Sequence, residues 1–254
     1  MTKILDSLGA ILVALAFMAF GVEHFVFQVF VTGRPPAWPA TLPGEHLISY
    51  ASGILIFSSG IAILTRRGWQ FPFFAGLLIL LWSGLRNIYE LVTRLDYGVI
   101  LTSTNKSLTI GGCALVMAAM LNSKTERGLI GKAIEPEKYF VGIFLFTAGI
   151  QHFIFAEFVK HLIPAWIPSP IFWTYFAGVA LAAGGLGIVT GIKAQLAATL
   201  SGLMIFIWLL VLHLPRALEF NNVNEWAAVA EATTVSGILL VIAPRLSDSR
   251  RKKT

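Results

Sequence analysis

Eight ionisable side chains fall inside or at the edges of long apolar stretches in this 254-residue sequence, and they are its candidates for chemistry. An ionisable group inside a membrane is costly unless it is paired or hydrated, so such residues are functional candidates by default. We expect them to hold a polar headgroup, to relay protons or to form structural ion pairs. They are Glu23, His24, Arg86, Glu90, His152, His213, Arg216 and Glu231.

Glu23 and Arg86 are candidates for a buried ion pair. Each lies roughly 21–23 Å along its predicted helix from the same membrane surface, which gives the two groups equal depth. In the second half of the chain Gln151 and Leu212 take the corresponding places, so both charges are missing together, as a pair requires. Arg86 and Glu90, four residues apart on one helical face, could satisfy each other instead, and a ligand-facing role is the third alternative.

His24 and His152 are the histidines that occupy corresponding positions in the two halves. We expect each imidazole to bond a neighbouring helix or an interfacial water. Two alternatives stay open, namely binding of a quinone headgroup and axial ligation of a haem iron by the two rings. No HxxxH or HExxH pattern indicates a metal site, and no nucleophile beside a base indicates a catalytic residue.

The chain repeats itself. The segment GVEHFVF at residues 21–27 returns 128 residues later as GIQHFIF at residues 149–155, and PAW at residues 36–38 returns at residues 164–166. Such self-similarity predicts two copies of one structural unit. We expect a first four-helix membrane repeat over residues 1–121, a polar cytoplasmic linker over 122–137, a second four-helix repeat over 138–246 and a basic cytoplasmic tail over 247–254.

Composition places the chain in a bilayer, because 56% of its residues are hydrophobic and 13% are charged. A helix needs about 20 residues to cross a hydrocarbon core of about 30 Å. Lipid leaves no backbone group unpaired, which favours helices over barrel strands for stretches that are apolar on all sides. We therefore predict an all-α integral membrane protein with eight transmembrane helices, arranged as two tandem four-helix bundles. The eight stretches begin near Leu8, His46, Pro72, Leu101, Tyr139, Ile171, Ala194 and Trp226.

Basic residues mark one side of the predicted membrane protein. Thirteen of the 19 Lys and Arg residues fall on the side that holds both termini, which predicts cytoplasmic termini. The net charge of +6 fits this topology and attraction to anionic lipid headgroups, and no nucleic-acid-binding motif is present. The single cysteine, Cys113, excludes an intrachain disulfide or a CxxC redox pair.

Several segments of the second half form a pattern: GIQHFIF at 149–155, IPAWIP at 163–168, WTYFAG at 173–178, HLPR at 213–216 and NEW at 224–226. Over residues 139–243 this half resembles the DoxX family of bacterial membrane proteins, whose members are four-helix membrane units. The first half is less similar, since NIYE at 87–90 stands in place of HLPR. The resemblance implies a bacterial cytoplasmic membrane.

Similarity to the DoxD subunit of thiosulfate:quinone oxidoreductase implies an accessory subunit of a quinone-linked redox system. That implies a quinone as the cofactor and a soluble or membrane redox partner, while no catalytic motif carries over. The alternative function is a carrier or exporter of a small lipophilic molecule, with the polar cluster lining a cavity, and a membrane scaffold is a third. Gly187 and Gly191 form a GxxxG pair that could serve packing within the chain or in a homo-oligomer.

Overall fold

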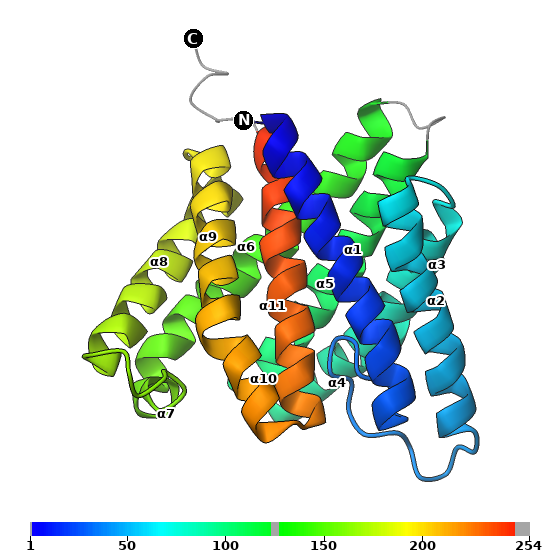
Figure 1. The fold of residues 1–254 in the computed structure, drawn as a ribbon, viewed down its shortest axis with the longest axis horizontal. Helices are drawn as coiled ribbons and strands as arrows, with labels where there is room; N and C mark the ends of the chain where they lie inside the picture. The colour runs from blue at the N-terminus through cyan, green and yellow to red at the C-terminus, as the bar shows by residue number, and fades with distance from the viewer. Residues whose placement is uncertain (1, 123–126, 247–254) are drawn as a thin grey trace.

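The protein is built from helices, and its described residues contain no strand. The computed structural model describes residues 2–122 and 127–246. Residues 123–126 of the predicted linker and the predicted tail, residues 247–254, lie outside the described residues. Figure 1 shows long helices running between two ends of the molecule. The helices are α1 (Thr2–Phe27), α2 (Glu45–Thr65), α3 (Gln70–Leu78), η1 (Ile79–Gly84), α4 (Leu85–Arg94), α5 (Val99–Leu121), α6 (Arg127–Ile154), α7 (Ala156–Lys160), α8 (Pro170–Thr190), α9 (Ala194–Trp208), η2 (Leu209–His213), α10 (Leu214–Phe220), α11 (Val223–Ile242) and η3 (Ala243–Arg245).

Within residues 2–122 and 127–246, six segments are long and apolar enough to cross a membrane. Among the described residues, α5 and α6 are of similar length, but polar side chains such as Asn105 and Lys106 interrupt the apolar character of α5. The predicted class, an all-helical protein of membrane type, is confirmed, and length and composition identify six of the eight predicted spans. The six are Ile4–Phe27, Glu45–Thr65, Gln70–Arg94, Pro170–Thr190, Ala194–Phe220 and Val223–Arg245.

The two halves of the chain pack on each other chiefly along two helix pairs, α1 with α11 and α5 with α6, and α5 also contacts α11. Figure 1 shows α1 lying beside α11. A Cβ atom added to Gly9 would lie 2.6 Å from the carbonyl oxygen of Gly237, so these backbones touch with no room for a side chain. The halves predicted as two tandem bundles are in broad contact with each other, because α1 packs on α11 of the other half about as extensively as on α2.

α6 begins earlier than the apolar stretch predicted from Tyr139. The helix starts at Arg127 and continues through Pro136. Ile134, Glu137 and Val141 recur at helical spacing and are buried. Residues 127–137 of the predicted linker are therefore part of the packed structure.

Two of the membrane-length segments contain a wider, π-helical turn. One is η1 between α3 and α4, and the other is η2 between α9 and α10. Such a turn inserts a residue into the helix and changes the direction in which the following side chains point, often at functional sites. In η1, the Ser83 hydroxyl donates a hydrogen bond to the Thr32 carbonyl at 2.7 Å. η2 ends at His213, which lines the cavity described below.

Candidate functional site

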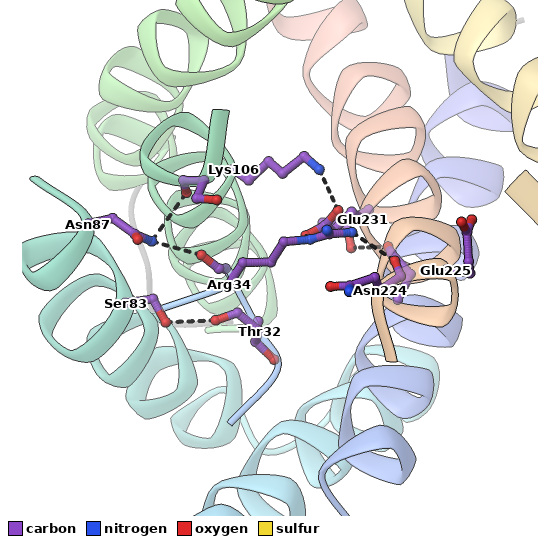
Figure 2. Close-up of polar contacts among 12 residues, drawn as sticks. Thr32, Arg34, Ser83, Asn87, Lys106, Asn224, Glu225 and Glu231 are labelled. Carbon is purple, nitrogen blue, oxygen red and sulfur yellow. Dashed lines mark hydrogen bonds and ion pairs between the residues drawn. The ribbon is translucent and has the colours of Figure 1, made fainter. Parts of the chain in front are cut away.

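Three charged side chains from separate elements meet in the interior of the protein. Glu231 of α11 is buried, with 3% of its surface exposed. Arg34 Nε lies 2.7 Å from Glu231 Oε1, and Lys106 Nζ of α5 lies 2.6 Å from Glu231 Oε2. Arg34 also donates from Nη2 to the Asn224 carbonyl at 2.9 Å. Figure 2 shows both cations converging on the carboxylate, so each of its oxygens has a charged partner.

The loop after α1 turns inward, and this turn places Arg34. The Asn87 side chain donates to the Gly33 carbonyl at 2.9 Å (Figure 2). Gly33 has a φ of +75°, and a Cβ atom there would lie 2.8 Å from Ser107 Cβ. Only glycine combines that backbone conformation with so close an approach to α5. The packing of the loop on η1, α4 and α5 thus directs Arg34 towards α11.

Arg34 belongs to the loop and keeps its charge in this setting. Burial lowers the pKa of its guanidinium, but the adjacent Glu231 carboxylate outweighs burial and raises the pKa overall. Glu23 of α1 is also buried and lies within electrostatic reach of Glu231 and Arg34. Its Oε2 atom has no hydrogen-bond partner among the described residues. The interior therefore holds two cations on one carboxylate, with a second carboxyl group nearby.

A cavity of about 790 Å³ adjoins this cluster. Sites for drug-sized ligands measure about 300–1,000 Å³ and are mostly apolar with a few placed polar groups. Here α5, α6 and α11 supply most of the wall. The rest comes from the loop after α1, the turn between α4 and α5, the segment from Phe155 to Leu162, α8, α9 and η2. Most of the lining is apolar. Its polar side chains within the membrane-length helices and the loop after α1 are Arg34, Thr102, Ser103, Lys106, Gln151, His152, His213 and Glu231.

Two imidazoles reach the wall of this cavity. His152 Nδ1 lies 2.7 Å from the Ala148 carbonyl oxygen, so Nδ1 carries the proton and Nε2 is left as an acceptor. His213 has no side-chain hydrogen bond to the rest of the described chain, although it lies near Lys106 and Glu231. Both rings can therefore bond a molecule in the cavity.

The predicted ion pair between Glu23 and Arg86 is not formed. Arg86 donates from Nη2 to the Ala37 carbonyl at 2.6 Å, and its guanidinium lies 4.5 Å from the ring centre of Trp82. The alternative pair of Arg86 with Glu90 is not formed either. Glu90 instead pairs with Arg94, one turn further along α4. Equal depth on two helices does not fix the direction of the side chains, and Arg86 points to the loop after α1.

His24 lies fully buried outside the cavity lining. Its Nδ1 lies 2.7 Å from the Phe20 carbonyl oxygen, and its Nε2 accepts the Val31 N–H at 3.4 Å. Both partners belong to its own helix and the following loop rather than to a neighbouring helix. Both ring nitrogens of His24 thus have partners within the chain, and His24 does not share the cavity that His152 lines.

The structure thus brings together part of the predicted site. Arg216 does not line the cavity, and it forms a bidentate salt bridge with Glu225 through hydrogen bonds of 3.2 and 2.6 Å. Of the eight candidates, those that line the cavity are His152, His213 and Glu231. Arg34 and Lys106 are not among the site residues predicted from the sequence. Lys106 carries a usable signal, a lysine in the middle of an apolar stretch, whereas no pattern distinguishes Arg34.

A larger hollow of about 1270 Å³ lies between α8 and α9. Its lining is almost wholly apolar, and several of the residues in it, such as Trp166, Leu200 and Ile207, are more than half exposed. This hollow is an outward-facing groove of the kind that lipid chains cover. Within the described residues no three His, Cys, Asp or Glu side chains form a group that could hold a metal ion. The charged cavity is therefore the candidate site.

Comparison with known proteins covers part of this site. Residues 141–243 match a family model described as a domain of unknown function (DUF8561). The matched region contains the helices that carry His152, His213 and Glu231, and it leaves out Arg34 and Lys106. No curated protein and no solved structure gives a significant match to the chain.

Proposed function

We propose that the protein crosses a bacterial cytoplasmic membrane eight times, with both termini on the cytoplasmic side. In support, α5 and α6 run between the same two ends of the molecule as the six apolar segments (Figure 1). Asp6 near the start of α1 pairs with Arg245 of η3 at 2.7 Å, as an even number of crossings requires. The excess of Lys and Arg predicted for this side supports a cytoplasmic assignment.

We also propose that the two halves are copies of one DoxX-like unit. Matching contacts support this. A Cβ atom on Gly53 of α2 would lie 2.9 Å from His24 Cβ, and one on Gly178 of α8 would lie 3.0 Å from His152 Cβ. Each half also has a π-helical turn in its third long helical segment. Lys106 and Glu231, which bond each other, lie on the last long helix of their respective halves.

For function, we propose that the protein binds a small lipophilic molecule with a polar headgroup. The observation that carries this proposal is the cavity that joins apolar walls to Lys106, His152 and His213. Apolar walls favour the body of such a molecule, and the few polar groups fix its headgroup. A ligand of this kind dissolves in the bilayer and can reach the site from the lipid.

Two uses of the site fit these features. Resemblance to the DoxX family favours an accessory subunit of a quinone-linked redox system, with a quinone headgroup against His152 and His213 and a redox partner nearby. The second use is a carrier or exporter of a lipophilic molecule. The carrier use is favoured because both halves of the chain line the cavity: Arg34 and Lys106 belong to the first half and His152 to the second. Many transporters bind their substrates where two structural repeats meet.

Mass spectrometry of the extracted small molecules tests the proposal. Protein purified in mild detergent should carry one lipophilic molecule per chain, and Ala148→Phe, which fills the cavity, should lose it. Ala51→Phe adds the same ring on the exposed face of α2 and should keep the ligand. A quinone would support the redox use, and another lipophilic molecule the carrier use. Bulk phospholipid alone, in equal amounts in all three proteins, would contradict the proposal and favour a scaffold.

A further inference from the structure

The polar part of the cavity has the composition of an anion site. We infer that the headgroup of the ligand is an oxyanion, either a carboxylate or a phosphate, carried on a single apolar tail. This inference rests on the proposed function, ligand binding in the cavity, and goes beyond it by fixing the charge of the headgroup.

Hydrogen-bond donors without partners dominate the charged part of the wall. Lys106 gives one of its three ammonium N–H groups to Glu231. Arg34 bonds Glu231 through Nε and the Asn224 carbonyl through Nη2, and its other N–H groups have no hydrogen-bond partner among the described residues. Charged donors therefore remain available, and each oxygen of the carboxylate among them already accepts a hydrogen bond from a cation.

The charges of the wall lead to the same conclusion. Arg34 and Lys106 share one carboxylate, and a cation without its own counter-charge is costly in the interior. Asp96, the other acid in the lining, is exposed, and its Oδ1 accepts the Gly98 N–H at 2.7 Å. Water screens its charge there. Glu23 neither lines the cavity nor forms an ion pair with either cation. Glu23 lies within electrostatic reach of Arg34 but contacts neither cation, so an anionic headgroup would supply a second counter-charge in direct contact with Lys106.

The remaining wall suits one apolar tail. Phe144, Leu145, Leu181 and Ile205 line it with apolar atoms. The volume of about 790 Å³ is that of a site for a drug-sized molecule rather than for a lipid with two chains. His213 and the Nε2 atom of His152 add neutral polar groups that can bond a headgroup or a water beside it.

Binding of matched probes to the full-length protein in detergent tests the inference. Oleate, 1-oleoyl lysophosphatidate and oleyl alcohol share one tail and differ in the headgroup. Wild-type protein should bind the better of the two anions at least about tenfold more tightly than the alcohol, which is the scale of one charge-assisted hydrogen bond. Whichever anion binds more tightly identifies the carboxylate or the phosphate as the preferred group.

Lys106→Met should weaken binding of the anion about 10- to 100-fold and leave the alcohol unchanged, because it removes a charged donor and keeps the Arg34–Glu231 pair. Lys132→Met, at an exposed position of α6, is the matched control and should bind like wild type. The comparison of headgroups on wild-type protein needs no variant, so it holds even if Lys106→Met fails to fold.

Equal affinity of wild-type protein for the anions and the alcohol would overturn the inference, and so would tighter binding of decylubiquinone than of either anion. Ligand binding in the cavity would still stand in both cases, provided that Ala148→Phe abolishes it. If none of the four probes bound, and Ala148→Phe behaved like wild type, the proposed function itself would fail.

Discussion

At the scale of single residues, the charge balance of the interior depends on Glu231. Both of its oxygens are bonded to cations that come from other elements. Loss of this carboxylate would leave Arg34 and Lys106 as two buried like charges, whereas loss of Lys106 would leave one intact ion pair. The three residues therefore contribute unequally to stability, even though they form one cluster.

Glu231→Leu should destabilise the protein by about 3–5 kcal/mol, because it strands both cations in a low dielectric. Lys106→Met should cost less, about 1–3 kcal/mol, the usual effect of removing one charged hydrogen bond. Chemical unfolding in mixed micelles measures both free energies.

Glu225→Gln is the control for these variants, since Glu225 pairs with Arg216 at a more exposed position. It should cost about 0–1 kcal/mol, as ion pairs near the surface do. If Glu231→Leu lowered the free energy of unfolding no more than Glu225→Gln does, the central role of Glu231 would be refuted.

The sequence predicts part of this cluster. An acid or a histidine inside an apolar stretch is easy to recognise, because placing an ionisable group in a membrane costs free energy. Glu231, His152 and His213 can therefore be predicted from the sequence. Arg34 cannot, because its direction follows from Gly33 and from contacts between segments far apart in the chain.

At the scale of elements, close contacts between helix backbones join the two halves of the chain. Gly237 of α11 and Gly9 of α1 form such a contact, since a Cβ atom on Gly237 would lie 2.8 Å from the Gly9 carbonyl oxygen. The length and the apolar character of these segments predict that they are helices. They do not predict that α1 packs on α11, because small residues indicate a close contact without naming the partner.

Gly237→Ala should destabilise the protein by about 1–3 kcal/mol, the usual cost of overpacking, because the added methyl group collides with α1. Gly131→Ala is the matched control. Nothing lies within 4 Å of a Cβ atom at that position of α6, so alanine should be neutral there, or stabilising by up to about 1 kcal/mol. Thermal unfolding in detergent compares the two variants. A Gly237→Ala protein as stable as Gly131→Ala would show that α1 and α11 can separate at no cost.

At the scale of the whole molecule, the account places one continuous helical assembly across a membrane. The six apolar segments were predictable from composition, because outward-facing residues must match the lipid. The roles of α5 and α6 were harder to predict, because their polar residues serve the interior. Lys106 lowers the hydropathy of α5 and at the same time supplies the cavity with a cation.

Cysteine labelling tests the orientation. The background is Cys113→Ala, which removes the buried native thiol. A cysteine in place of Thr41, in the loop after α1, should react with an impermeant maleimide in intact cells. A cysteine in place of Arg67, in the turn between α2 and α3, should react only after the cells are permeabilised. The reverse pattern would contradict cytoplasmic termini.

The most direct test of the central claim, that the cavity binds a lipophilic molecule, is a crystal structure of the protein grown from a lipidic mesophase. The account predicts elongated non-protein density in the cavity, with its polar end within hydrogen-bond distance of Lys106 and its tail between Phe144 and Leu181. A cavity that is closed by its own side chains, or that holds only water around Lys106 and Glu231, would contradict the claim.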